Sequence, residues 1–182
     1  MTHTLIVYAH PWTGSLNHAI LEAVTSALDA AGRPYDVIDL LTDGFDPRYD
    51  AAELALFRSG GTNDPLVTRY QGLVERATRL VVIAPVWWND VPAVLKGFID
   101  KVMKQQWAYV PTGRGIRGRL GHVEEALVLT TSTSPTWYLR YLAGNAVGSV
   151  FLGATAKQLG MRGRRWVNLG QVGKSSGHRR AD

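Results

Sequence analysis

The 182-residue sequence contains no cysteine. This absence excludes a disulfide scaffold, thiolate catalysis and cysteine-based zinc sites, and it fits a reducing cytoplasm, where we expect the protein to reside. The five histidines show no metal-ligand spacing, so we expect no bound metal. No basic segment with a signal-type apolar run precedes the first apolar stretch, which favours the same location.

Long hydrophobic runs are also missing. The one apolar stretch that approaches a membrane span, residues 141–156, is shorter than the ~20 residues that a bilayer requires. It contains Asn145 and is bracketed by Arg140 and Lys157. We therefore expect no membrane insertion. The many glycines and alanines of this stretch suggest a helix that another backbone approaches closely, either at a subunit interface or within the same chain.

Acidic residues are fewer than basic ones, which leaves a formal net charge of +5. The excess lies in a glycine-rich segment from Arg114 to Arg119 and in the tail from Arg162 to Arg180, without a recognition helix or a surface of aromatic residues. We therefore expect no nucleic-acid partner. The segment from Gly113 to Gly118 matches the GxGxxG pattern, but that fingerprint must follow a strand and open a helix. Here it lies in a long loop predicted over residues 104–122.

Apolar residues make up 46% of the chain, enough for the core of one domain over residues 1–182. Apolar stretches typical of buried strands alternate with segments of helical spacing. The predicted strands are residues 4–10, 34–40, 79–84, 125–131 and 165–172, and the predicted helices are residues 17–31, 51–58, 66–77, 92–103 and 135–159. This α/β alternation predicts a doubly wound sheet of five parallel strands in the order 2-1-3-4-5, with helices on both faces.

Ligands of such sheets bind where the strand order reverses, outside the carboxyl ends of the first and third strands. Residues 10–17 and 85–90 follow those two strands, and residues 130–134 follow the fourth strand beside them. We therefore expect these three loops to form the binding site.

The first loop carries groups that suit a phosphate. Ser15 and Asn17 precede or begin a helix, where free N–H groups and the helix dipole attract anions, and His10 lies in the same loop. The alternative for Ser15 and Asn17 is ordinary helix capping. The third loop has four hydroxyl residues in a row, which either hydrogen-bond the polar edge of a ring or a ribityl chain, or simply end the strand.

The second loop contains two adjacent tryptophans, Trp87 and Trp88, between Pro85 and Pro92. Two indoles at this place offer a flat wall on which a planar ligand can stack. The alternative is that one or both indoles seal the core beneath the loop. Flat surface, phosphate binding and hydroxyl groups together favour a flavin.

The sequence resembles the flavodoxin-like NAD(P)H quinone oxidoreductase family, which includes the ancillary flavoproteins of glutathione-gated potassium efflux. The resemblance extends from the first predicted strand to the last. It rests on His10-Pro11, Ser15-Leu16-Asn17, Pro85-Val86-Trp87-Trp88, the helix start from Val91 to Lys101, and Thr130-Thr131. It implies a flavodoxin-like fold and a homodimeric enzyme in which flavin takes hydride from NAD(P)H and then passes two electrons to a quinone or a similar small aromatic acceptor.

By this resemblance, one set of residues contacts the flavin. They are His10, Ser15, Leu16, Asn17, Pro85, Val86, Trp87, Trp88, Thr130, Thr131, Ser132 and Thr133. The size of the chain favours FMN as the cofactor, with FAD as the alternative.

The sequence departs from the family pattern at two places. Ser132 and Thr133 stand where the family has two glycines. Tyr138 matches a tyrosine thought to handle protons at the reduced ring, but Gly144 occupies the position of the accompanying histidine. Tyr138 is therefore our candidate catalytic residue, or a lining residue of the acceptor pocket. A second interpretation of the same fold is a flavin-binding regulatory subunit that docks on a transporter, with incidental turnover.

Overall fold

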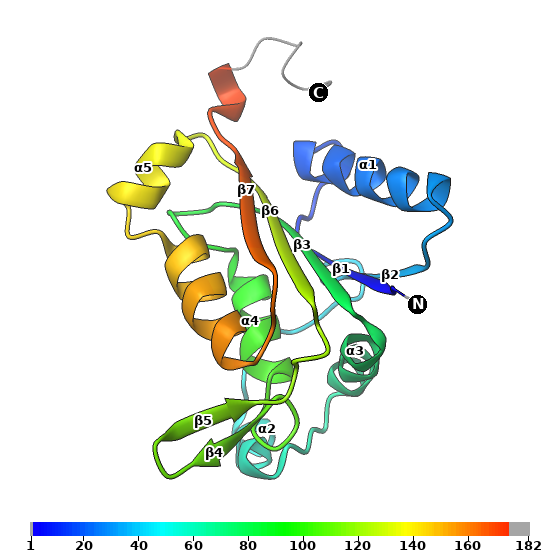
Figure 1. The fold of residues 1–182 in the computed structure, drawn as a ribbon, viewed down its shortest axis with the longest axis vertical. Helices are drawn as coiled ribbons and strands as arrows, with labels where there is room; N and C mark the ends of the chain where they lie inside the picture. The colour runs from blue at the N-terminus through cyan, green and yellow to red at the C-terminus, as the bar shows by residue number, and fades with distance from the viewer. Residues whose placement is uncertain (1, 175–182) are drawn as a thin grey trace.

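A computed structural model describes residues 2–174, and five parallel strands form its central sheet (Figure 1). In spatial order the strands are β2 (Tyr35–Asp39), β1 (Thr4–Tyr8), β3 (Arg79–Pro85), β6 (Glu125–Thr131) and β7 (Arg164–Leu169). This is the predicted sheet, and its order agrees with 2-1-3-4-5 once β4 and β5, which form a separate hairpin, are left out of the count.

Helices connect these strands, and three of those in the described residues begin at a side-chain cap. The helices are α1 (Leu16–Ala30), α2 (Ala51–Ala55), the 3-10 turn η1 (Phe57–Ser59), α3 (Pro65–Arg76), α4 (Ala93–Val102), α5 (Thr136–Tyr141), the π-helix η2 (Ala146–Ala156) and the 3-10 turn η3 (Val172–Lys174). The side chains of Ser15, Asp50 and Asp64 accept backbone N–H bonds at the starts of α1, α2 and α3. Gly32, with φ of 60°, lets the chain turn after α1.

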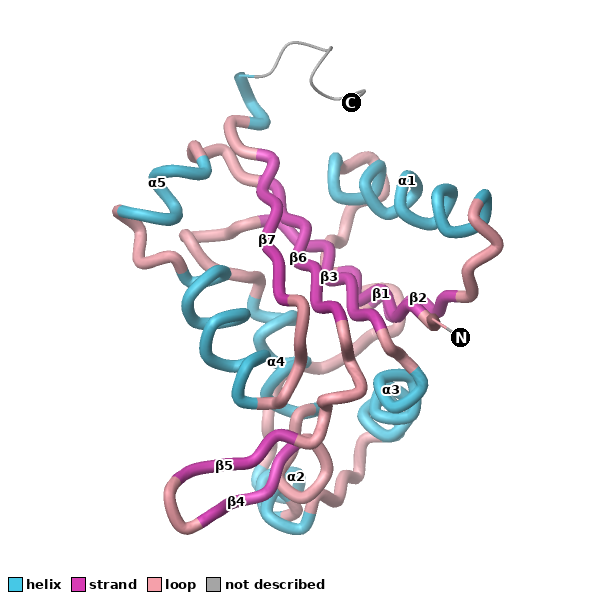
Figure 2. The backbone as a smooth tube through the Cα atoms, in the orientation of Figure 1, coloured by secondary structure: helices cyan, strands magenta, loops and turns pink. Residues whose placement is uncertain are grey.

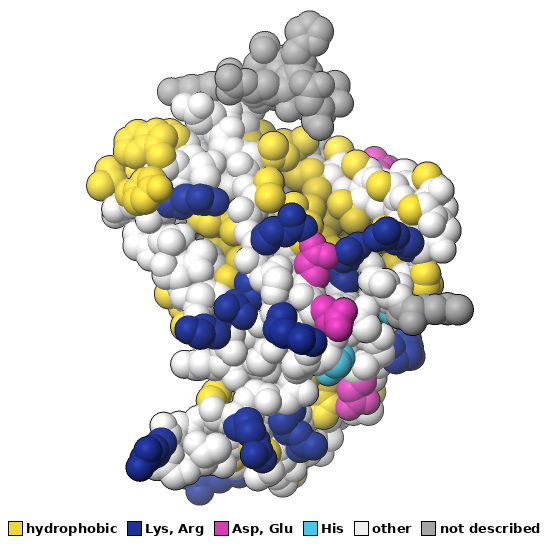
Figure 3. Space-filling view, viewed as in Figure 1, with side chains coloured by type: hydrophobic (Ala, Val, Ile, Leu, Met, Phe, Trp, Pro, Cys, Tyr) yellow, Lys and Arg dark blue, Asp and Glu magenta, His cyan; other side chains and the backbone are white. Residues whose placement is uncertain are grey.

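The two faces of the sheet are covered unequally. The larger core lies on one face, where α3, α4 and η2 pack against the alternate residues of β1, β3 and β6. Within residues 2–174, α1 is the one helix that packs on the other face, against Ile6, Tyr8, Val81 and Ile83 (Figure 2). The part of that face beside β7 leaves Val167 and Leu169 partly exposed, and hydrophobic side chains gather there in Figure 3.

The predicted helix over residues 135–159 is wrong as a single element. The chain leaves α5 after Tyr141, and both Gly144 and Asn145 adopt left-handed backbone angles, with φ of 79° and 50°. Two successive left-handed residues cannot continue a right-handed helix. The chain then begins again as η2, which is separate from α5.

The predicted loop over residues 104–122 contains a hairpin of two antiparallel strands, β4 (Tyr109–Thr112) and β5 (Gly115–Gly118). The GxGxxG segment forms its turn and its second strand, so it opens no helix, as predicted. Basic side chains gather over this hairpin, which projects from one end of the molecule (Figures 1 and 3). Gly118 packs tightly at its base, since a Cβ there would lie 2.1 Å from the carbonyl carbon of Leu159.

Two buried lysines fasten the segment between β2 and α3 to the end of α4. The Lys101 ammonium donates to the Asp64 carboxylate at 2.9 Å. Lys104 is fully buried; its ammonium donates to the Gly61 carbonyl at 2.7 Å and pairs with the Glu53 carboxylate. Within residues 2–174, no helix combines the length and the apolar character needed to cross a membrane.

Candidate functional site

The carboxyl ends of β1, β3 and β6 bring the three predicted loops to one edge of the sheet. Parallel pairing sets Tyr8 beside Ile83 and Pro85 beside Thr131. The Val86 N–H donates to the Thr131 carbonyl at 2.8 Å, which ties the second loop to the third. The three predicted loops therefore lie next to one another at one edge of the sheet.

The first loop ends at a capped helix whose start carries no acidic residue. The Ser15 hydroxyl accepts the His18 N–H at 3.1 Å, and Leu16 is the first helical residue. Ser15 therefore does cap the helix, yet its single hydroxyl hydrogen stays available for a ligand. Nδ1 of His10 accepts the Trp12 N–H at 3.1 Å, and the His10 ring lies 6.3 Å from the Trp87 ring.

Asn17 links the first loop to the third. Its side chain is only 2% exposed, and its amide nitrogen donates to the Thr131 hydroxyl at 2.9 Å. The amide oxygen is buried and has no hydrogen-bond partner. Because an unsatisfied buried polar atom costs about 1–3 kcal/mol, such an atom between two of the predicted loops indicates a place for a ligand group.

The second loop is a tight turn that displays an indole. The N–H groups of Trp87 and Asp90 each donate to the other residue's carbonyl, at 2.9 and 3.1 Å. Trp88 and Asn89 between them have φ of 50° and 67°, the arrangement of a type I′ turn. Trp88 is 98% exposed and Trp87 is about half exposed. The alternative in which these indoles seal the core is therefore wrong.

A large aromatic residue is unfavourable in this left-handed conformation, which glycine and asparagine adopt readily. Trp88 thus combines a strained backbone with an almost fully exposed apolar ring. Neither property stabilises the folded chain. Strain of this kind concentrates at functional sites, which makes Trp88 the strongest ligand-contact candidate of the site.

The hydroxyl residues of the third loop do not share one direction. Thr130 and Ser132 both bond Asn168 of β7. The Thr130 hydroxyl donates to the Asn168 amide oxygen at 2.7 Å, and the Asn168 amide nitrogen donates to the Ser132 hydroxyl at 3.0 Å. Thr131 faces the opposite side of the sheet and bonds Asn17. Thr133 is exposed. The run of hydroxyls therefore forms two separate sets of contacts.

Sequence reasoning missed the contribution of β7 to this site. The indole N–H of Trp166 donates to the Thr130 hydroxyl at 2.8 Å, so Trp166 and Asn168 together fix the third loop from below. The register of β6 and β7 pairs Thr130 with Asn168, and it is this pairing that would have identified Trp166 and Asn168 as residues next to the site.

An open pocket of about 300 Å³ joins the second and third loops to α5. Its lining residues are Val86, Trp88, Asn89, Ser132, Thr133, Ser134, Tyr138 and Leu139. Tyr138 is partly exposed, and its ring meets that of Trp137 edge-on at 6.3 Å. The pocket therefore places Tyr138 with Trp88, whereas His10, Ser15 and Asn17 lie outside its lining.

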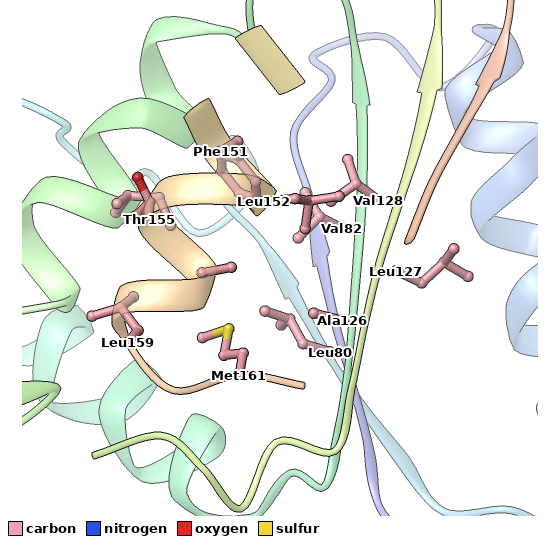
Figure 4. Close-up of a pocket in the computed structure, with 12 residues that line it drawn as sticks. Leu80, Val82, Ala126, Leu127, Val128, Phe151, Leu152, Thr155, Leu159 and Met161 are labelled. Atoms are coloured by element: carbon pink, nitrogen blue, oxygen red, sulfur yellow. The ribbon is translucent and has the colours of Figure 1, made fainter. Parts of the chain in front are cut away.

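A second cavity lies inside the molecule, between the sheet and η2 (Figure 4). It is lined by apolar side chains such as Leu80, Val128 and Phe151, and its volume of about 10 Å³ is close to the minimum for one water molecule. A ring-shaped ligand does not fit there. This cavity is a small packing gap beneath η2.

Comparison with known proteins agrees with this geometry. A family model described as flavodoxin-like fold matches residues 2–181. NAD(P)H dehydrogenase (quinone) 1 of Cavia porcellus is 28% identical over 155 residues, which cover 76% of this chain and 56% of the relative. The chain thus spans little more than half the length of that protein.

Solved structures resemble the whole described chain. The NAD(P)H:quinone oxidoreductase from Methanothermobacter marburgensis has a TM-score of 0.88 at 29% identity, over 99% of this chain and 92% of that one. An FMN-dependent NADH-azoreductase from Bacillus anthracis, solved in complex with FMN, has a TM-score of 0.76 at 20% identity over 99% and 92% of the two chains, a likeness that shows the fold alone. The chain belongs to the flavodoxin-like family, and NAD(P)H quinone oxidoreductases are among its relatives.

Proposed function

We propose that this protein is a flavin-dependent NAD(P)H:quinone oxidoreductase that works by a two-step, two-electron exchange. The observation that carries the proposal is the exposed Trp88 indole, held in a strained turn above a pocket that Tyr138 shares. FMN is the proposed cofactor, with FAD as the alternative, and NAD(P)H is the proposed donor. The relatives, whose names describe NAD(P)H quinone oxidoreductases, support the same chemistry.

The chemistry of the residues in the three loops supports a flavin nucleotide as the ligand. The start of α1, with the Ser15 hydroxyl and the N–H groups after it, would hold phosphate, and the unpartnered Asn17 oxygen would accept a hydroxyl of the ribityl chain. His10, Leu16 and the backbone from Pro85 to Val86 would border the cofactor. A bound flavin would supply the site with a group that accepts and donates hydride.

The chain's own side chains would position the reactants and keep water out. Trp87 and Trp88 would flank the ring, and Thr130 to Thr133 would border its far edge. Tyr138 lines this pocket and would contact the acceptor there. A quinone or another small aromatic acceptor would occupy the pocket.

A homodimer is part of the proposal. Trp137, Tyr141, Leu142 and Val150 are more than half exposed on α5, the loop after it and η2. Such a concentration of large apolar residues beside a pocket is typical of an interaction surface. A second subunit would bury it and would help to enclose the acceptor. We place this enzyme in the cytoplasm, in keeping with the absence of cysteine.

The test is a titration of the colourless protein with FMN and with FAD, followed by steady-state assays with NADH or NADPH and a benzoquinone. Saturable flavin uptake and rapid quinone reduction support the proposal. Flavin uptake without turnover would instead favour the regulatory subunit of a transporter, the alternative for this fold. Protein that takes up neither flavin would contradict both.

Replacing Trp88 with asparagine is expected to change stability and cofactor binding in opposite directions. Asparagine adopts the left-handed turn readily, so the free energy of unfolding should rise by about 1 kcal/mol. Loss of the indole face should raise the FMN dissociation constant about tenfold. Urea unfolding of the apoprotein and fluorescence titration with FMN measure the two quantities.

The matched control is Trp88→Tyr, which keeps an aromatic face in the same strained turn. This variant should retain FMN within about threefold and gain no stability. FMN binding by Trp88→Asn that equals the wild-type value would remove Trp88 from the proposed site.

A further inference from the structure

The side chain of Asn168 on β7 lies in a hydrogen-bond network with a defined direction. The Trp166 indole N–H can only donate, and it donates to the Thr130 hydroxyl at 2.8 Å. The hydrogen of that hydroxyl is directed at the Asn168 amide oxygen, 2.7 Å away. Asn168 therefore presents its amide oxygen to Thr130 and its amide nitrogen to the residues on the other side.

The amide nitrogen of Asn168 holds two further hydroxyl groups. It donates to the hydroxyls of Ser132 and Thr136, both at 3.0 Å. Each of these hydroxyls uses its own hydrogen on a backbone carbonyl: Ser132 donates to Ser134 at 2.7 Å, and Thr136 donates to Asn168 at 3.3 Å. Each hydroxyl is therefore an acceptor toward the Asn168 side chain, and this arrangement needs an amide at position 168.

These partners belong to the wall of the pocket that Tyr138 lines. Ser132 and Ser134 are lining residues, and Thr136 is the first residue of α5, the helix that carries Tyr138. In the described residues no side chain caps the start of α5. The bond from Asn168 to Thr136 therefore holds the first turn of this helix against β7. Asn168 itself lies outside the lining of the pocket.

The cofactor side of the third loop is held by other bonds. Thr131 faces the opposite side of the sheet, where its hydroxyl accepts the Asn17 amide at 2.9 Å. The backbone adds a bond that involves neither amide, from the Ser132 N–H to the Leu169 carbonyl at 3.0 Å. Loss of the Asn168 amide should therefore leave the loop folded and the proposed cofactor contacts of Asn17 in place.

We infer that Asn168 is a positioning residue for the acceptor: through Ser132 and Thr136 it sets the shape of the pocket wall, and thereby the affinity for a quinone, without contributing to flavin binding. This inference rests on the proposed function and gives a residue of the outer strand a separate role in it. Asn168 contacts neither reactant. Its effect reaches the acceptor through the two hydroxyl groups that its amide holds.

The experiment replaces Asn168 with leucine, which keeps the size of the side chain and removes its three hydrogen bonds. The KM for a benzoquinone should rise about tenfold, the effect of one or two lost hydrogen bonds, while kcat stays within about twofold. Calorimetric titration of the oxidised, flavin-loaded protein with the same quinone, without NAD(P)H, should show an equal rise in its dissociation constant. The FMN dissociation constant, from fluorescence titration of the apoprotein, should stay within about twofold.

The control is Tyr70→Phe. Tyr70 is a fully buried tyrosine whose hydroxyl donates to the Asp43 carboxylate at 2.9 Å, away from the three loops. Its replacement removes a hydrogen bond from the core and should leave the quinone and FMN constants unchanged. This variant separates an effect on the pocket from a general loss of stability.

Thr136→Val is a second, milder variant, because it removes one partner of Asn168 and keeps the shape of the side chain. It should raise the quinone KM about threefold and leave the FMN constant unchanged. In the Asn168→Leu background it should raise the quinone KM no further, because the two residues act through one bond. This variant alone decides the inference if Asn168→Leu does not fold.

Each outcome decides the inference. A rise confined to the quinone constants establishes the role of Asn168. Unchanged quinone constants in Asn168→Leu or in Thr136→Val, equal rises for quinone and FMN, or a fall in kcat at constant KM would overturn it while leaving the proposed function standing. Wild-type protein that takes up no flavin, or that takes up flavin and reduces no quinone, would overturn the proposed function and this inference with it.

Discussion

Lys104→Met is expected to lower the free energy of unfolding by about 3–5 kcal/mol at neutral pH. Lys104 is fully buried, and its ammonium is the partner of the buried Glu53 carboxylate. Methionine fills similar volume but leaves that carboxylate without its counter-charge. The Glu53 carboxylate still accepts the Thr62 hydroxyl and the Asn63 N–H at 2.5 and 2.9 Å, which do not replace a cation. Urea unfolding measures the loss.

The same pair predicts a pH dependence. Burial raises the pKa of Glu53, but hydrogen bonds from Lys104, Thr62 and the Asn63 N–H outweigh it and lower the pKa to about 2. A carboxyl group whose folded pKa is lowered stabilises the fold above its unfolded pKa, and this contribution disappears as the pH falls through the folded value. The wild-type protein should therefore lose the contribution of Glu53 between about pH 4.5 and 2.

The matched control is the double variant Lys104→Met with Glu53→Gln. Removing both charges avoids an isolated buried ion, so much of the lost stability should return. The double variant should also lack the part of the acid dependence that Glu53 supplies. If the single variant is as stable as the wild type, or if the double variant is less stable than the single one, the pair does not hold α2 to α4 as described.

Gly118→Ala is expected to lower the free energy of unfolding by about 3 kcal/mol and the melting temperature by about 6–12 °C. A Cβ at position 118 would lie 2.1 Å from the carbonyl carbon of Leu159 and 2.4 Å from the carbonyl oxygen of Gln158. Both atoms belong to the backbone, so no side chain can rotate away. The base of the hairpin would have to move from the end of η2. Thermal unfolding followed by circular dichroism measures the change.

Gly113→Ala is the control for this substitution, in the turn of the same hairpin. A Cβ there meets nothing within 4 Å, and Gly113 is not among the glycines with positive φ. Its melting temperature should stay within about 2 °C of wild type. Equal losses in the two variants would show that the hairpin is sensitive to any added methyl group and would remove the argument from close packing.

The strands and most helices were predictable because their patterns are strongly periodic. The predicted helices at residues 17–31, 66–77 and 92–103 differ from α1, α3 and α4 by one residue at each end. The hairpin β4–β5 was not predictable, because its glycines and arginines carry no alternating apolar pattern. The break before η2 depends on the Gly144–Asn145 pair, whose left-handed tendency was outweighed in the prediction by the surrounding apolar run.

The location of the candidate site was predictable, but the directions in which its side chains point were less so. Topology alone placed the three loops together. Alternation along β6 already implied that Thr130 and Ser132 face away from Thr131, although the prediction treated the hydroxyls as one group. The exposure of Trp88 could be recognised only from the geometry of its turn, because a tryptophan beside a core strand is more often buried. The contribution of Asn168 to the site could be identified only from the pairing of β7 with β6.

The outer position of β7 has a consequence for how this sheet would extend. In the described residues β7 pairs only with β6, and on its other side the carbonyls of Trp166 and Asn168 accept hydrogen bonds from the Arg140 guanidinium and the Thr136 hydroxyl. A copy of the strand laid alongside in the same direction would bring the guanidinium groups of Arg164 and Arg165 against their own duplicates. An oppositely directed copy would separate them. Charge and these two occupied carbonyls would both work against the in-register stacking from which fibrils grow.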